Sequence, residues 1–292
     1  MIGRRLATSA IGVVAVAGGI LLFGPGGPSP AIDVAARRAI VRTADEADVA
    51  LSGLAAALGP AVDAGRAGSA RTVAGEEAPG PMFAEAAELT RAAEAKAAAA
   101  RGALVALNRA RNARDPGASP IEAVPEAGEL DSIAQQLRAS GEAADEFAAM
   151  RDRALSVVGE LDAAIAALDA GDLADARDHV ARARDAHTAV AEWDVGLVTL
   201  PVWVETTDAM IGAVERIVTA TESGDPAAAD RAAREFAALA DEAAPADRAL
   251  RIAIGEGGSA VAAVPLERLA SILTAIDDAR ATVASVREAA QR

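Results

Sequence analysis

The chain has 292 residues, a formal net charge of -15 and aromatic residues at only 2% of its composition. Cysteine is absent, which excludes disulfides, thiolate metal sites and cysteine nucleophiles. Alanine, the best helix former, dominates the sequence, and we therefore predict an all-α fold. An acidic surface repels phosphate backbones, so we expect no nucleic-acid partner.

The first 31 residues have the pattern of a membrane-targeting segment. Arg4 and Arg5 precede an uncharged stretch of eighteen residues, 6–23, and a Gly/Pro-rich linker follows it. This length is at the lower limit for spanning a bilayer and long for the apolar part of a cleavable signal peptide. We predict either a signal anchor, with the membrane contacted through 6–23, or a signal peptide whose cleavage leaves the protein secreted.

The orientation in the membrane is predicted from the ends of this segment. A short basic start and an exit of small residues resemble an export signal, which favours one plasma-membrane span with an extracytoplasmic body. Arg37, Arg38 and Arg42 lie on the other side of the apolar stretch, within the window that the positive-inside rule counts. The two signals therefore point in opposite directions.

An N-terminal helical hairpin is predicted over residues 32–114. Apolar residues recur at helical spacing over 32–58, and a Gly-Pro pair at 59–60 is a stop signal. Repeated glycines and prolines over 59–81 indicate a flexible loop. Residues 82–114 are then helical again, with an alanine-rich face.

The main bundle is predicted over residues 129–292, after a Pro-rich linker at 115–128. Its longest helix is expected over 129–169, where apolar residues recur every seven positions on two interleaved ladders. A strict seven-residue repeat makes a narrow seam that must be buried against other long helices. Only Ser140 and Arg151 interrupt the ladders.

Two glycine-aspartate pairs predict the chain reversals of this bundle. Glycine can adopt the left-handed conformation at a helix C-terminus, and aspartate can cap the next helix. Gly171-Asp172 predicts an antiparallel hairpin between 129–169 and the helix that follows. Gly224-Asp225 repeats the signal at an offset of 53 residues and suggests a second hairpin.

Residues 193–204 contain the only two tryptophans and are the best candidate for a contact surface. Pro201 is expected to kink or end a helix nearby. In one interpretation the indoles fill the bundle core. In the other they line an apolar groove or a membrane-facing edge, and the contact residues are then Trp193, Leu197, Leu200 and Trp203.

The C-terminal part is predicted to contain a hinge between two helices. A short helix follows Pro245 and leads into the glycine-rich run 255–259. This run follows a helix and lacks the lysine of a phosphate loop, so we interpret it as a flexible hinge. A terminal amphipathic helix follows it.

No residue pattern indicates catalytic chemistry. His179 and His187 are the only histidines. At eight residues apart on one helix, their backbones are separated by about 12 Å, too far for neighbouring ligands of one metal ion. The acidic pairs at 76–77 and 277–278 are assigned to the solvated surface. We expect no catalytic residue, metal or cofactor, and we regard His187 as a candidate pH-sensitive packing residue.

Together these patterns predict an extended antiparallel bundle of coiled-coil-like hairpins after an N-terminal membrane segment. We hypothesise a non-enzymatic, membrane-anchored cell-envelope module that docks an envelope protein partner through incompletely buried helix faces. The alternative is an extracytoplasmic carrier of a lipid or other apolar ligand, with 193–204 lining its pocket. A third hypothesis is a sensory ectodomain that works with a separate transmitter.

Overall fold

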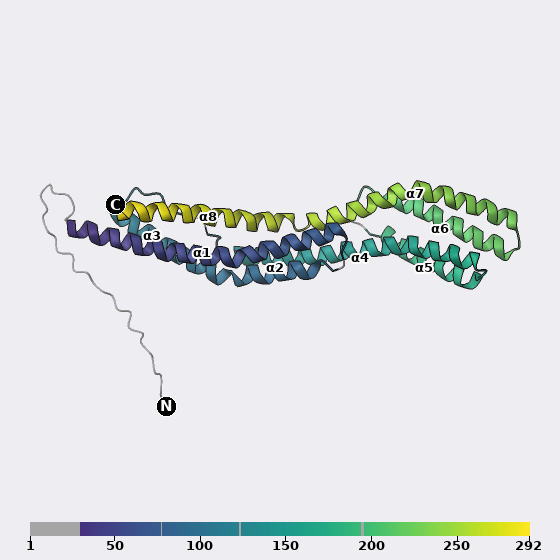
Figure 1. The fold of residues 1–292 in the computed structure, drawn as a ribbon, viewed down its shortest axis with the longest axis horizontal. Helices are drawn as coiled ribbons and strands as arrows, with labels where there is room; N and C mark the ends of the chain where they lie inside the picture. Colours follow the sequence, from purple (N-terminus) through teal and green to yellow (C-terminus); the bar gives the residue numbers. More distant parts are fainter. Residues whose placement is uncertain (1–29, 77, 123, 194–195) are drawn as a thin grey trace, which may run out of the picture.

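A computed structural model describes residues 30–292 except positions 77, 123, 194 and 195. Every regular element in these residues is an α-helix, which confirms the all-α prediction (Figure 1). In chain order the helices are α1 (Pro30–Ala74), α2 (Gly80–Ala92), α3 (Glu94–Arg114), α4 (Glu129–Asp169), α5 (Leu173–Ala191), α6 (Leu200–Glu222), α7 (Pro226–Ala260) and α8 (Ala263–Gln291).

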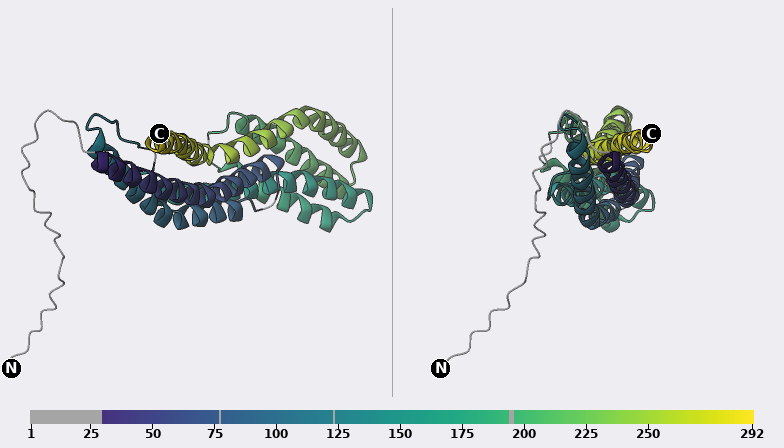
Figure 2. Two further views of the ribbon diagram at one scale, coloured as in Figure 1. Left: turned by 60° about the vertical axis from the view of Figure 1, so that its left-hand side comes forward. Right: turned by 90° about the vertical axis from the view of Figure 1, so that its left-hand side faces the viewer.

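The helices run side by side in a long rod (Figures 1 and 2). The start of α1 and the C-terminal ends of α3 and α8 lie together at what we call the proximal end. The α4–α5 and α6–α7 turns lie at the opposite, distal end. At about 1.5 Å per residue, α7 and α8 in succession extend for roughly 95 Å, so the rod is far longer than it is wide.

The buried apolar residues form two clusters that change over in the middle of α4. The proximal core joins α1, α2, α3 and α8 to α4 as far as Ala144, and the distal core begins at Met150. The two interruptions of the apolar ladders flank this changeover. Ser140 is buried and donates to the carbonyl of Val261 at 2.8 Å, whereas Arg151 lies against Gly75. The predicted seam therefore faces two successive sets of helices.

Both predicted hairpin turns are present, and they share one geometry. Gly171 and Gly224 have φ angles of 78° and 69°, in the left-handed region. The carboxylates of Asp172 and Asp225 each accept a hydrogen bond from the backbone amide three residues later, at 3.0 and 2.9 Å. Local turn chemistry therefore sets both reversals.

The loop predicted over 59–81 is much shorter in the structure, because α1 continues through Pro60 to Ala74. Ala61 and Val62 follow the proline and are buried in the proximal core. Burial of this face offsets the backbone hydrogen bond that a proline removes from a helix interior. Gly68 adds close packing, since a Cβ there would lie 3.0 Å from the ring of Phe83.

The helix boundaries differ from the prediction at three other places. The predicted helix 82–114 is divided at Ala93 into α2 and α3. Pro201 lies in the first turn of α6, where its missing N–H has no intrahelical partner to lose, so it begins a helix instead of ending one. Pro245 lies inside α7.

The predicted glycine hinge at 255–259 is an ordinary part of α7. A Cβ on Gly257 would lie 2.7 Å from the ring of Phe147 in α4, and one on Gly258 would lie 2.5 Å from Cγ2 of Thr72 in α1. These glycines let three helices approach closely at the changeover between the cores. These glycines pack closely at the crossing, which replaces the hinge interpretation.

The linker 115–128 separates the two predicted helical regions in sequence but not in packing. Helix α8 packs along α1, and α2 packs along the first half of α4. One core is therefore built from residues on both sides of the linker.

One described helix, α1 from Asp33 to Ala74, is long and apolar enough to cross a membrane by length and composition. In the rod this helix packs against α2, α3 and α8. The predicted membrane segment, 6–23, lies outside the described residues.

Candidate functional site

The tryptophan region connects α5 to α6, and its large side chains turn inward. Trp203 is 1% exposed and Trp193 is 7% exposed, and both belong to the distal core. Leu200 is also buried, and Leu197 is half-buried against the same core. The structure therefore brings together all four predicted contact residues, but around the core between α4, α5 and α6.

Each indole has a specific partner. Trp193 donates from Nε1 to Oε1 of Glu146 at 3.2 Å and meets the ring of Phe147 edge to face at 4.9 Å between centroids. Trp203 stacks on the imidazole of His187 at 5.7 Å. Nε2 of His187 lies 3.0 Å from the carbonyl of Val204. The hydrogen bond of Trp193 and the ring contacts of both indoles explain the two tryptophans as packing residues.

The exposed apolar residues of this region are ones that the sequence analysis did not single out. Val198 is 91% exposed and Val202 is 55% exposed. Val198 lies in the turn before α6, and Val202 lies in the first turn of the helix. Leu200 and Trp203 are buried in the same stretch, so the start of α6 decides which side chains face outward.

A groove of about 390 Å³ runs between α5 and α6, which belong to different hairpins. Val180 and Val218 are buried at its floor, and Ala181 and Thr219 are exposed along it. Its α5 wall carries Arg177 and Arg184, and its α6 wall carries Glu215 and Glu222. The groove thus combines an apolar floor with one basic and one acidic wall.

Ion pairs across this groove hold its walls in place. Arg184 donates to Glu215 at 2.9 Å and to Asp208 at 3.0 Å, and Arg177 pairs with Glu222. A wider groove of about 730 Å³ borders α6 on its other side, against α7, where Arg216 and Glu235 pair at 2.8 Å. Helix α6 is therefore accessible along both edges in the distal half.

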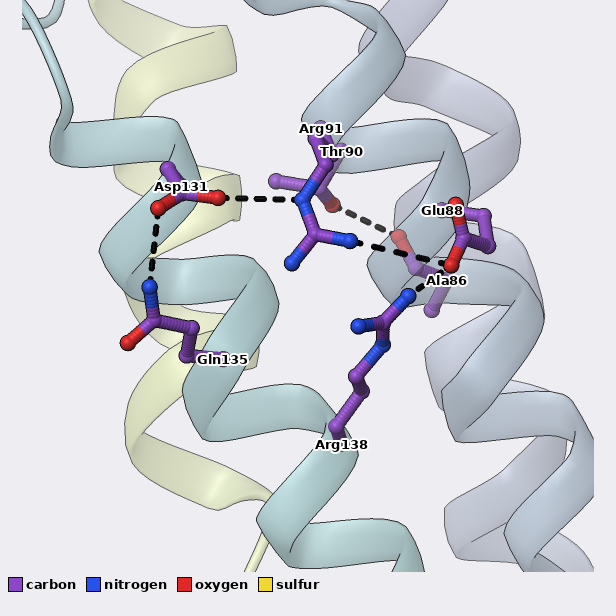
Figure 3. A network of polar contacts seen from close by, with 7 residues as sticks. All are labelled: Ala86, Glu88, Thr90, Arg91, Asp131, Gln135 and Arg138. Atoms are coloured by element: carbon purple, nitrogen blue, oxygen red, sulfur yellow. Dashed lines mark hydrogen bonds and ion pairs between the residues drawn. The ribbon is translucent and has the colours of Figure 1, made fainter.

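A polar network joins α2 to α4 in the proximal half (Figure 3). Nε of Arg91 donates to Asp131 at 3.0 Å, Gln135 donates to the same carboxylate at 2.8 Å, and Arg138 pairs with Glu88. The hydrogen bond from Arg91, followed by that from Gln135, lowers the pKa of Asp131. This aspartate is therefore held ionised, and the network aligns two helices without supplying a proton donor.

The second polar cluster joins α4 to α5 near the distal end. Nδ1 of His179 lies 2.6 Å from Glu160, and Arg182 donates to the same carboxylate at 2.9 Å. Asp175 lies on the other side of the imidazole, 3.5 Å from Nε2. The hydrogen bond from His179, followed by that from Arg182, lowers the pKa of Glu160. Within the described ranges, no group of three potential ligands could hold a metal ion.

Comparisons with protein-family models, with curated proteins and with solved structures find no match to this chain. The candidate site therefore rests on geometry alone, and the groove between α5 and α6 is the described surface with the best-defined chemistry.

Proposed function

We propose that this chain is a non-enzymatic, membrane-anchored helical module of the cell envelope that docks a protein partner on its distal half. The groove between α5 and α6 carries the proposal, because it offers an apolar floor between walls of opposite charge. An amphipathic helix lays its apolar face into a groove of this kind through residues spaced three and four apart. The charged walls would select the direction of that helix.

The shape of the rod supports the same proposal. Helices α5 and α6, which line the groove, lie in the distal half, away from the start of α1 (Figure 1). If residues 6–23 insert in a bilayer, the rod would hold the groove several tens of ångströms from the headgroups, given a rise of about 1.5 Å per residue. A partner in the extracytoplasmic space could then reach it without contacting the membrane.

Site-specific photo-crosslinking in the protein's own host tests the docking surface. A photoreactive amino acid replaces Ala181, which lines the groove, or Ala166, an exposed residue of α4 that does not line it. We expect a defined protein adduct from position 181 and none from position 166. A lipid-sized adduct at 181 would instead support the apolar-ligand alternative, and equal adducts at both positions would refute the groove.

Membrane attachment and orientation are tested separately. We expect the full chain to remain in the membrane fraction after alkaline extraction, and protease added to intact cells to digest the rod. Release by alkali would contradict an anchor. Protection of the rod until the membrane is permeabilised would place it on the cytoplasmic side, as the three arginines after the apolar stretch would predict.

A further inference from the structure

The proximal end of the rod is basic, although the chain as a whole is acidic. The first turns of α1, the end of α3 and the end of α8 meet there, as the end-on view in Figure 2 shows. Arg114 of α3 pairs with Asp33 of α1 at 3.2 Å, and Arg287 of α8 pairs with Asp45 of α1 at 3.3 Å. Arginines outnumber carboxylates at this end: Arg37, Arg38, Arg42, Arg109, Arg111, Arg114, Arg287 and Arg292, against Asp33, Asp45, Glu46, Asp115 and Glu288.

The distal end has the opposite charge. Around its two turns the carboxylates outnumber the arginines, and they include Asp162, Asp169, Asp172, Asp175, Asp178, Glu222, Asp225 and Asp230. The net charge of -15 is therefore distributed unevenly, and the rod is electrically polar along its length. The proximal end therefore has the opposite sign of charge from the chain as a whole.

Two of the three arginines near the start of α1 are placed to meet an external anion. Arg37, Arg38 and Arg42 line a shallow groove of about 450 Å³ between α1 and α8, together with Asp45, Val34 and Val41. Nε of Arg37 donates to Asp33 at 2.9 Å, so this arginine is already paired. Arg38 is exposed and has no carboxylate partner among the described residues. Arg42 is 74% exposed, and its nitrogen lies 3.8 Å from Glu46, too long for a strong ion pair. Guanidinium groups bind phosphate oxygens in a bidentate manner, and the valines offer an apolar surface beside them.

The sequence before α1 identifies what this end would face. Only residues 24–29 separate the apolar stretch from Pro30, and six extended residues reach about 20 Å at most. If 6–23 insert in a bilayer, the linker is short enough for the arginines of the first turns to reach its surface, where anionic headgroups attract basic side chains within a Debye length of about 8 Å. This step rests on the anchor in the proposed function, but it applies to either leaflet.

We propose that Arg38 and Arg42, with Arg37 beside them, bind the phosphate headgroups of anionic phospholipids. This contact sets the rod upright, because the same surface charge repels the acidic distal end. The anchor alone would leave the rod free to tilt about the short linker.

The absence of native cysteine allows a direct test on the full chain. A fluorophore is attached at Ala35→Cys beside the arginines or at Ala174→Cys near the distal end, and the protein is reconstituted into vesicles. The vesicles contain phosphatidylcholine alone or with about one third phosphatidylglycerol, and a trace of headgroup-linked quencher. We expect at least twofold stronger quenching at position 35 in the anionic vesicles, and no such gain at position 174.

Matched variants identify the groups responsible. Replacing Arg37, Arg38 and Arg42 by Gln should abolish the gain at position 35, and replacing all three by Lys should retain most of it. The control removes the same charge from the exposed distal arginines Arg231, Arg234 and Arg248 and should leave the gain unchanged. Circular dichroism checks that each variant is folded.

The outcomes separate this proposal from the anchor on which it rests. A protein that fails to float with vesicles of either composition would refute the anchor. Flotation with both compositions, but with quenching indifferent to phosphatidylglycerol or to the Gln substitutions, would overturn the headgroup contact and leave the anchor standing. Loss of the gain in millimolar inorganic phosphate at constant ionic strength would assign the arginines to a free anion and would also overturn it.

Discussion

Replacing Gly258 by Ala tests how tightly α7 crosses α1 and α4 at the changeover between the two cores. A Cβ at this position would lie 2.5 Å from Cγ2 of Thr72 and 3.2 Å from Cβ of Phe147. Neither neighbour moves freely. Oγ1 of Thr72 donates to the carbonyl of Gly68 at 2.9 Å, and the Cβ of Phe147 is fixed to the backbone of α4.

The magnitude follows from opposing effects. Alanine in a helix gains about 1 kcal/mol over glycine through its propensity. Overpacking of a closely packed interior costs about 1–3 kcal/mol, and rotating Thr72 away would add about 1 kcal/mol for its lost hydrogen bond. We therefore expect Gly258→Ala to lower the free energy of unfolding by about 1–2 kcal/mol. The control is Gly159→Ala on α4, where no atom lies within 4 Å of the new Cβ, and it should stabilise by up to about 1 kcal/mol.

Thr72→Ser supplies the rescue, because it removes the opposing methyl group and keeps the hydroxyl. In a double-mutant cycle we expect the pair to interact favourably by at least about 1 kcal/mol. Urea unfolding followed by circular dichroism measures the whole rod, and tryptophan fluorescence measures the distal core, which holds both indoles. A Gly258→Ala protein that is stabilised like Gly159→Ala would refute the close crossing, and a cycle without coupling would show that Thr72 is not the obstacle.

Three further predictions follow from local contacts. Asp172→Ala and Asp225→Ala should each cost about 1 kcal/mol in urea unfolding, because each removes a helix cap, whereas Asp185→Ala on the exposed face of α5 should cost much less. Glu160 has a pKa below its usual 4.5, chiefly through the hydrogen bond from His179, so its contribution to stability is present above pH 4.5 and is lost as the pH falls through the folded-state pKa. Glu160→Gln should therefore destabilise at pH 7 and have progressively less effect below pH 4.5; an effect that is constant from pH 7 to pH 3 would contradict this linkage. The tryptophan emission should be blue-shifted and unchanged by added vesicles, since both indoles are buried, and a lipid-dependent shift would contradict their core placement.

The parts of the fold that local chemistry determines could be predicted from the sequence. The reversals at Gly171 and Gly224 need a residue in the left-handed conformation followed by a helix cap. A glycine followed by an aspartate meets both requirements, so the pair can be recognised in the sequence. The bounds of α4 were predicted as 129–169 from the apolar ladders and agree with the structure. Even the two interruptions of the ladders were informative, because Ser140 and Arg151 flank the point where the partner helices change.

Proline and glycine were misleading where tertiary packing outweighs local preference. Pro60 has the signature of a helix stop, but the helix continues because Ala61 and Val62 beyond it are buried. The glycines at 257 and 258 have the signature of a hinge, but each is small because an aromatic ring or a threonine methyl occupies the space of a side chain. A single sequence does not reveal which neighbour lies beside a glycine. A flexible hinge and a close helix crossing therefore have the same sequence pattern.

The candidate contact residues illustrate a different limit. The apolar character of 193–204 was evident, but the direction of each side chain depends on where α6 begins. With α6 starting at Leu200, Trp203 turns into the core and Val202 turns out. The groove between α5 and α6 could not be predicted, because its walls come from two hairpins whose relative placement no local pattern specifies.

The close crossing in the middle of the rod connects the two proposals. A flexible hinge at 255–259 would let the distal half swing, and a contact at the proximal arginines could not then orient the groove. With Gly257 packed on Phe147 and Gly258 on Thr72, α7 is held against α4 and α1, and α4 itself runs unbroken through both cores. An orientation set at the headgroups is therefore carried to the distal groove by continuous helices. Forcing α7 away from Thr72 with Gly258→Ala should reduce crosslinking at position 181 and leave headgroup quenching at position 35 intact. This combination would show that the orientation set at the headgroups is transmitted along the rod to the groove.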